Sequence, residues 1–214
     1  MSNIAVFPVV RAAVPSAKNG KVHNQPPRRD KNSTRREREY LTGDEVEALV
    51  KAARARGRWG HRDAALILLA YRHGLRASEV TGLKWDAVDL DNRQLHITRR
   101  KNGKPSVHPL RDAEIRELRR LHREVNGSPY VFQSERLGKL STRSVHYLVT
   151  EAGKAAGLPF PVHPHMLRHG CGYKLANDGA DTRLIQDYLG HRNITHTVRY
   201  TELNAGRFSD FFED

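Results

Sequence analysis

The sequence predicts a mainly α-helical fold with one small antiparallel β-sheet, an α+β class. Two observations predict it. Beyond residue 40, most segments carry apolar side chains three or four residues apart, which is the period of an amphipathic helix. One segment, residues 94–108, instead alternates apolar and polar side chains on both sides of Asn102-Gly103, as is typical of a β-hairpin with a tight turn. No fixed-period repeat is visible in the chain.

The first helix is expected over residues 43–56. Thr42 and Glu45 have the spacing of a capping box, and Leu41 can pack against Val46 across the start of the helix. From Val46 onward the apolar residues keep helical spacing, so one face of this helix should be buried.

The second helix, residues 61–73, is apolar on nearly every side, so we expect it to be buried and to end at Gly74. Another helix should begin beside Arg76, and the hairpin strands follow near 94–98 and 106–108. Five more helices are expected near residues 112–125, 142–156, 164–178, 182–189 and 195–203, with Gly157, Gly179 and Gly190 at C-terminal ends.

The charge of the chain points to a nucleic acid partner. Of 214 residues, 37 are Lys or Arg and 24 are Asp or Glu, which gives a net charge of +13. The single cysteine, Cys171, excludes a disulfide framework and a Cys-rich zinc module. No apolar stretch reaches the roughly 18–20 residues that span a bilayer, and the N-terminus lacks the basic region of a signal peptide. We therefore expect a soluble intracellular protein with no membrane partner.

Much of this charge lies in an N-terminal segment. Residues 1–38 hold nine basic and two acidic residues, a net of +7, and four of the ten prolines. Such a segment buries too little apolar surface to fold, so we expect an arm over 1–38 and one folded domain over 39–214. One interpretation is a solvated, disordered tail, and the other is a DNA-binding arm that lies along phosphates. The two are compatible, because an arm can be disordered until it meets DNA. The residues of the DNA-binding reading are Arg28, Arg29, Lys31, Arg35, Arg36 and Arg38.

Two arginines are candidates for contacting phosphate. Arg76 follows a helix-ending glycine and stands near a helix N-terminus, where free N–H groups favour an anion, although it could simply pair with Glu79 on the surface. His165 and Arg168 are three residues apart, so on a helix they share a face and suit the non-bridging oxygens of a phosphate. The alternative for this pair is a capped helix with solvated histidines.

The histidines near Arg168 also raise the question of a metal site. His163, His165 and His169 are close in sequence, but no carboxylate or thiolate stands at a ligand-like spacing, so no metal is expected.

Two further candidates are weak when taken alone. A tyrosine such as Tyr200 is usually a core or surface aromatic, and a lysine at a hairpin tip, such as Lys101, is usually solvated.

The resemblance to a known family comes from six candidates taken together, namely Arg76, Lys101, His165, Arg168, His191 and Tyr200. Their order and spacing resemble the active-site pattern of the tyrosine recombinase (phage integrase) family. The intervals of 23 residues from Arg168 to His191 and 9 from His191 to Tyr200 match that pattern, and the resemblance covers residues 41–208. Over residues 163–169 and 181–194 the sequence is similar to the short fimbrial phase-switch recombinases, which invert a promoter-bearing DNA segment. The implied fold is a tyrosine recombinase catalytic domain. Most members carry a separate core-binding domain before the catalytic domain, whereas only about forty residues precede the catalytic domain in this sequence, so we expect no core-binding domain here.

The resemblance implies an enzyme that breaks and rejoins DNA. Tyr200 would attack a scissile phosphodiester, forming a 3′-phosphotyrosyl link and freeing a 5′-hydroxyl. The other implied roles are transition-state stabilisation for Arg76 and Arg168, general acid for Lys101, proton-handling partner of Tyr200 for His165, a hydrogen bond to the phosphate for His191, and orientation of Arg76 for Glu79. No metal or other cofactor is required.

The resemblance also implies the partners. They are double-stranded DNA with specific recombination sites and a homotetramer on synapsed DNA, with room for accessory DNA-bending proteins. The outcome would be inversion, integration or excision, in a bacterial cytoplasm and in association with the nucleoid. The aromatic tail, residues 207–212, would dock onto a neighbouring protomer, or alternatively close the chain's own core.

Three other functions remain as alternatives. A type IB topoisomerase would use the same chemistry, but the short chain and the spacing favour strand exchange. A non-catalytic DNA-binding regulator that retains the fold would be expected to lack one of the six candidates. A basic RNA- or ribosome-binding module would explain the charge but not the spaced Arg, His and Tyr set.

Overall fold

The computed structural model describes residues 38–99, 105–124 and 127–202. The chain divides into two compact units, Met1–Glu37 and Arg38–Asp214, and every described residue belongs to the second. Arg38, which we assigned to the arm, forms an ion pair with Glu45 and lies over the ring of Phe160, so it is anchored to this unit. The rest of the proposed arm lies outside the described residues, as do Lys101 and the aromatic tail.

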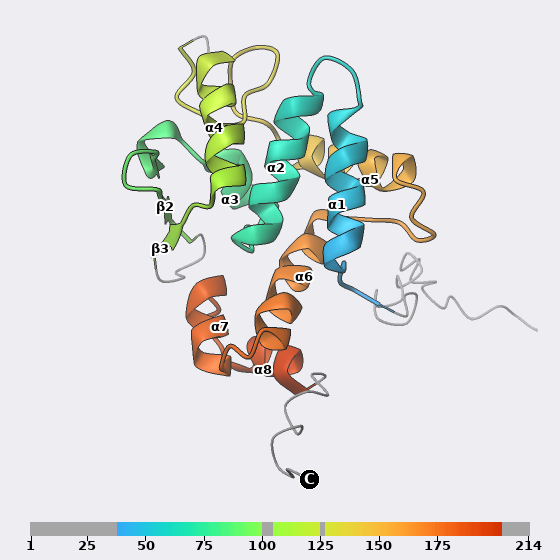
Figure 1. Cartoon of the computed structure of the whole chain (residues 1–214), viewed down its shortest axis with the longest axis vertical. Coiled ribbons are helices and arrows are strands. Elements are labelled where there is room, and N and C mark those ends of the chain that lie inside the picture. Colours follow the sequence, from blue (N-terminus) through green and yellow to red (C-terminus); the bar gives the residue numbers. More distant parts are fainter. Residues whose placement is uncertain (1–37, 100–104, 125–126, 203–214) are drawn as a thin grey trace, which may run out of the picture. The chain divides into compact units, whose positions relative to one another are not determined.

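The second unit is mainly helical with one small antiparallel sheet, which confirms the predicted fold class (Figure 1). Its helices are α1 (Gly43–Arg54), α2 (Gly60–Arg72), α3 (Ala77–Gly82), the 3-10 helix η2 (Trp85–Ala87), α4 (Asp112–Glu124), α5 (Thr142–Ala155), α6 (Pro164–Asn177), α7 (Thr182–Leu189) and α8 (Thr195–Glu202). Its strands are β1 (Val88–Asp89), β2 (Gln94–Ile97) and β3 (Ser106–Pro109). The predicted helix ends agree with these bounds to within two residues.

The sheet has the order β1-β2-β3 and contains the predicted hairpin as β2 and β3. Leu95 pairs with both Val88 and His108, so β2 is the central strand of the sheet. Strand β1 was not predicted, because two residues are too few to show an alternating pattern.

Helices α1 and α2 lie side by side, and α6, α7 and α8 gather beyond one end of them (Figure 1). The main apolar core joins α1, α2 and α5 with the sheet, and includes Leu49, Leu66 and Val149, none of which is exposed. A second, smaller cluster is formed by Cys171, Ala176, Ile185, Leu189 and Tyr200 of α6, α7 and α8. The tyrosine singled out from the sequence is therefore part of a core.

Local signals explain why the helices begin and end where they do. The capping box of Thr42 and Glu45 is present at the start of α1. Gly74 and Gly190 follow α2 and α7 with φ of 56° and 64°, a left-handed conformation that glycine adopts at little cost. Both glycines lie directly before segments that carry candidate site residues. No helix among the described residues is long and apolar enough to cross a membrane.

Candidate active site

Arg76 occupies the N-cap position of α3, where the chain has just reversed at Gly74. Its backbone N–H donates to Oε2 of Glu79 at 3.0 Å, and its Nη1 donates to Oε1 at 2.7 Å. The Arg76 side chain is 30% exposed, whereas that of Glu79 is 2% exposed. Glu79 therefore holds Arg76 from the buried side and leaves part of the guanidinium at the surface.

Glu79 is ionised in this setting. Burial alone would raise the pKa of its carboxyl, but the hydrogen bonds from Arg76 and the positive charge of Arg99 outweigh burial and hold the pKa below its ordinary value. A charged carboxylate that accepts hydrogen bonds on both of its oxygens has a fixed orientation. It can therefore set the orientation of the arginine that it holds.

Arg168 lies on α6 and is almost completely buried, with 1% of its surface exposed. Its guanidinium donates to the carbonyl of Gly74 and, at 2.7 Å, to the carbonyl of Leu189. Burial, reinforced by the charges of Arg76 and Arg99, lowers the pKa of Arg168 to about 10, so it remains charged at neutral pH. Arg168 thus joins the turn before α3 to the end of α7, and brings its charge beside that of Arg76.

His191 follows Gly190 at the end of α7. Its Nδ1 lies 2.8 Å from the hydroxyl oxygen of Thr197, and its ring is nearly parallel to that of Tyr200, with centroids 6.2 Å apart. Burial lowers the pKa of His191 to about 3, helped by the charges of Arg168 and Arg76. His191 is therefore neutral at physiological pH, and its Nε2 is the nitrogen suited to contact a ligand.

Tyr200 lies on α8 with 1% of its surface exposed. Its hydroxyl is 2.8 Å from Nδ1 of His169, and its ring packs against Gly172, where an added Cβ would lie 2.7 Å from the ring. Burial raises the pKa of Tyr200, and the charges of Arg199 and Arg168 oppose that rise. The hydroxyl is thus protonated and bonded inside the protein.

The histidine that contacts Tyr200 is His169, not the predicted partner His165. Burial, the neighbouring His165 and the charge of Arg199 lower the pKa of His169 to about 2, so it is neutral. His165 lies one helical turn earlier, with its ring centroid 4.4 Å from that of His169 and nearly perpendicular to it. Desolvation of its ring by the surrounding protein, together with the charge of Arg168, lowers the pKa of His165, although part of the side chain still reaches solvent. His165 is exposed, so it remains available to a ligand at the surface.

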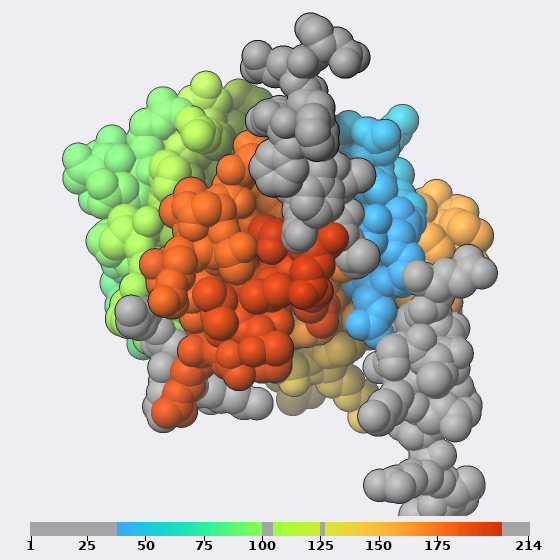
Figure 2. Space-filling model, turned by 90° about the horizontal axis from the view of Figure 1, so that it is seen from below, coloured from blue at the N-terminus to red at the C-terminus, as the bar shows by residue number. Residues whose placement is uncertain are grey.

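Five of the six predicted catalytic residues therefore come together: Arg76, His165, Arg168, His191 and Tyr200. The turn after α2 and the helices α6, α7 and α8 contribute them, and these helices form much of the face seen in Figure 2. Lys101 lies outside the described residues. No group of three or more His, Cys, Asp or Glu within the described ranges is arranged to hold a metal ion.

Two residues of this cluster were not predicted. His169 was seen only as a member of a histidine-rich motif, and its contact with Tyr200 joins residues 31 apart in the chain. Arg99 lies two residues after β2, and its buried side chain forms an ion pair with Glu79 at 3.0 Å. The only sequence signal for Arg99 is its place two residues before Lys101.

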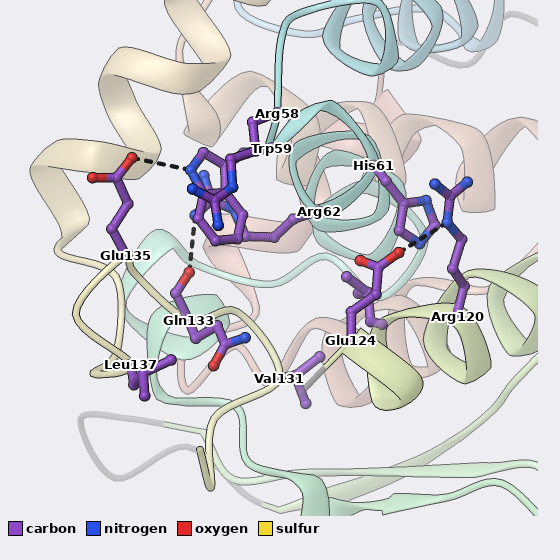
Figure 3. A pocket seen from close by; sticks show the side chains of 11 residues that line it. Arg58, Trp59, His61, Arg62, Arg120, Glu124, Val131, Gln133, Glu135 and Leu137 are labelled. Carbon is purple, nitrogen blue, oxygen red and sulfur yellow. Dashed lines mark hydrogen bonds and ion pairs between the residues drawn. The ribbon is translucent and has the colours of Figure 1, made fainter. Parts of the chain in front are cut away.

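A separate hollow of about 450 Å³ lies at the other end of α2 (Figure 3). Trp59 donates to Glu135 at its edge, and Arg62 donates to the carbonyl of Gln133. None of the six predicted catalytic residues lines it. The chemistry predicted from the sequence therefore belongs to the α6–α8 face and not to this hollow.

Comparison with known proteins agrees with this geometry. Residues 39–207 match the phage integrase family. The chain is 49% identical to the type 1 fimbriae regulatory protein FimE of Escherichia coli strain K12, over 82% of this chain and 91% of that protein. It is 45% identical to the type 1 fimbriae regulatory protein FimB of the same strain, over 81% of this chain and 88% of that protein.

Solved structures show the same fold. The crystal structure of XerA recombinase matches with a TM-score of 0.71 at 26% identity, over 82% of this chain and 65% of that one. A lambda integrase dimer bound to a COC′ core site matches with a TM-score of 0.61 at 26% identity, over 76% of this chain and 47% of that one. The chain thus spans less than two thirds of either solved chain.

Proposed function

The chain belongs to the phage integrase family and is a tyrosine-type site-specific DNA recombinase, and on that premise we propose that it inverts a DNA segment between two recombination sites. The observation that carries the proposal is the convergence of Tyr200 with Arg168, Arg76 and His191. The similarity to FimE and FimB over most of their length supports a role in fimbrial-type phase variation.

The proposed reaction starts at one phosphodiester. The oxygen of Tyr200 forms a bond to phosphorus, the bond from phosphorus to the 5′-oxygen breaks, and the 5′-oxygen takes up a proton from Lys101. Arg76 and Arg168 stabilise the negative charge that builds up on the non-bridging oxygens, and a planar, permanently charged guanidinium suits that task. His191 donates a hydrogen bond to the same phosphate through Nε2, and His165 accepts the proton that leaves the Tyr200 hydroxyl. Attack by a 5′-hydroxyl of a partner strand reverses these steps and reseals the DNA.

Tyr200 must become accessible before this reaction. Tyr200 and Arg168 each have 1% of their surface exposed, so neither can contact a phosphate without rearrangement. Helix α8, which carries Tyr200, has only eight residues. We propose that DNA binding shifts α8 so that the hydroxyl of Tyr200, which His169 orients, reaches the scissile phosphate.

The proposed assembly is a homotetramer on two synapsed sites, because each of the four strands needs its own tyrosine. The arm of residues 1–37 would add sequence-independent affinity, the tail of residues 207–212 would contact a neighbouring protomer, and accessory DNA-bending proteins would assist synapsis. In the cell we propose a cytoplasmic protein associated with the bacterial nucleoid. No cofactor enters any of these steps.

A recombination assay tests the inversion. The purified protein is used to select bound fragments of chromosomal DNA, and two copies of the selected site are placed on a plasmid in inverted orientation. We expect restriction digestion to show inversion of the intervening segment with wild type and none with Tyr200→Phe. A protein that binds the sites but never rearranges the plasmid would instead be a DNA-binding regulator.

A further inference from the structure

Arg99 is a buried arginine that the mechanism above does not use. It follows β2, and its side chain has no exposed surface. Burial lowers its pKa, and the charge of Glu79 opposes that effect. A guanidinium in such a position costs free energy unless charged and polar groups surround it, so its contacts reveal why it is there.

The contacts of Arg99 reach three segments of the site. Nη1 donates to Oε2 of Glu79 at 3.0 Å and lies 3.5 Å from the carbonyl oxygen of Gly74. Nη2 donates to the carbonyl of His73 at 3.3 Å and to the carbonyl of Tyr188. One side chain therefore joins the end of β2 to the turn before α3 and to the last turn of α7.

Glu79 is held between two arginines as a result. Its Oε1 accepts from Arg76 Nη1 at 2.7 Å, and its Oε2 accepts from Arg99 Nη1 at 3.0 Å. Arg76 is partly exposed while Arg99 is buried, so Arg99 fixes the carboxylate from inside and Arg76 receives its orientation outside. Arg168 donates to the same Gly74 carbonyl that Arg99 approaches, which links the second phosphate-binding arginine to the same point.

The residue before His191 leaves room for Arg99. An added Cβ at Gly190 would lie 2.7 Å from Cγ of Arg99 and 2.9 Å from its Nε, which is closer than real Cβ contacts allow. Gly190 therefore serves two purposes: it ends α7 in the left-handed conformation, and it admits the Arg99 side chain.

We propose that Arg99 is a positioning residue for the recombinase reaction, acting on Arg76 through Glu79, while its bonds to the carbonyls of His73 and Tyr188 hold the Arg99 side chain in place. Being buried, it does not contact the phosphate itself. This role for Arg99 rests on the proposed function, in which Arg76 and Arg168 contact the scissile phosphate.

The test measures one round of DNA cleavage. A nicked substrate that traps the covalent intermediate is mixed at saturating concentration with Arg99→Met, which keeps an unbranched stem but removes the guanidinium with its charge and donors. We expect cleavage to slow by roughly 10- to 100-fold, because small displacements of catalytic groups have effects of that order, while the Kd for DNA changes less than about 3-fold. Arg62→Met is the matched control, since Arg62 forms an ion pair with Asp63 near the far end of α2 and should cleave at the wild-type rate.

A second measurement separates positioning from general destabilisation. If Arg99 acts through Arg76, adding Arg99→Met to Arg76→Ala should reduce cleavage far less than it does in wild type. Arg99→Lys retains the charge for Glu79 but cannot reach both carbonyls, so it should fold and cleave at an intermediate rate; it replaces Arg99→Met if that variant fails to fold.

The outcomes are distinct. The positioning role would be overturned if Arg99→Met cleaved at the wild-type rate, or if it slowed cleavage by the same factor in Arg76→Ala as in the wild-type protein. Either result would leave the recombinase function standing. Absence of any adduct with the wild-type protein would overturn the function itself.

Discussion

The hydroxyl of Tyr200 lies 2.8 Å from Nδ1 of His169, and both side chains are buried. Because burial and nearby positive charge keep His169 neutral, its Nδ1 can accept the tyrosine hydrogen. The hydroxyl of Tyr200 is therefore held by His169, whereas the sequence pattern paired Tyr200 with His165. This contact fixes where the hydroxyl points before DNA arrives.

Replacing His169 should weaken both the fold and the chemistry. His169→Ala leaves a buried hydroxyl without its partner, which costs about 1–3 kcal/mol of unfolding free energy. Single-turnover cleavage should also slow, because the Tyr200 ring loses its fixed orientation. His169→Asn, whose amide can replace Nδ1, should recover part of both losses. Chemical denaturation and cleavage of a nicked substrate measure the two effects. Equal rates for wild type and His169→Ala would show that the contact has no part in the reaction.

Gly172 should be sensitive to the smallest substitution. The Cβ of Gly172→Ala would lie 2.7 Å from the Tyr200 ring, so the ring and α8 must shift. Overpacking of this kind costs about 1–3 kcal/mol, and we expect a corresponding fall in Tm together with slower cleavage. Gly43→Ala is the control, since a Cβ there meets nothing within 4 Å. If both variants behave alike, the close packing of Tyr200 against α6 is not what matters.

The stability of the protein should fall in mild acid, with His108 as one cause. Nδ1 of His108 lies 3.2 Å from Nδ1 of His73, its ring stacks on that of Tyr188, and its Nε2 is hydrogen-bonded to the hydroxyl of Ser106. The charged groups nearby are Arg99 and the His73–Glu114 ion pair. Burial, with the charges of His73 and Arg99, lowers its pKa to about 3. Between pH 6.5 and 3 the unfolded chain therefore binds a proton that the folded protein refuses, so stability decreases as the pH falls.

A substitution isolates this contribution. His108→Val removes the titrating group, and its stability should depend less on pH by up to about 1.4 kcal/mol per pH unit below pH 6. Denaturant unfolding at pH 7 and pH 5 measures the difference. A pH dependence identical to that of wild type would mean that His108 is not kept neutral by the fold.

Deleting residues 1–37 should weaken DNA binding without slowing cleavage at saturating DNA. The deletion ends before Arg38, because Arg38 pairs with Glu45 in the folded unit. Each lost phosphate contact lowers the slope of log affinity against log salt by about 0.9. Replacing Arg28, Arg29, Lys31, Arg35 and Arg36 with Gln in the full-length chain should reproduce the change. An unaltered salt slope would exclude a DNA-binding arm.

Local signals in the sequence were sufficient for most of the fold. The capping box of Thr42 and Glu45 and the helix-ending Gly74 and Gly190 act within a few residues, so their effects can be read directly. Strand β1 was missed because it is only two residues long and depends on pairing with β2.

The site was predictable only in part, for a similar reason. Arg76, Arg168, His191 and Tyr200 were found by their spacing and family resemblance. Arg99 and His169 owe their importance to contacts with residues 20 and 31 positions away, and no local pattern records such contacts. His165 was assigned to the tyrosine proton by resemblance, whereas the hydroxyl contacts the histidine one turn further along α6.

The central claim is that Tyr200 becomes covalently joined to DNA. The most direct measurement incubates the protein with its selected site carrying a nick next to the scissile phosphate, and then separates protein–DNA adducts under denaturing conditions. We predict a covalent adduct with the wild-type protein, mapped by peptide mass spectrometry to Tyr200, and none with Tyr200→Phe. An adduct that persists in Tyr200→Phe, or wild-type protein that binds this DNA without forming an adduct, would contradict the account.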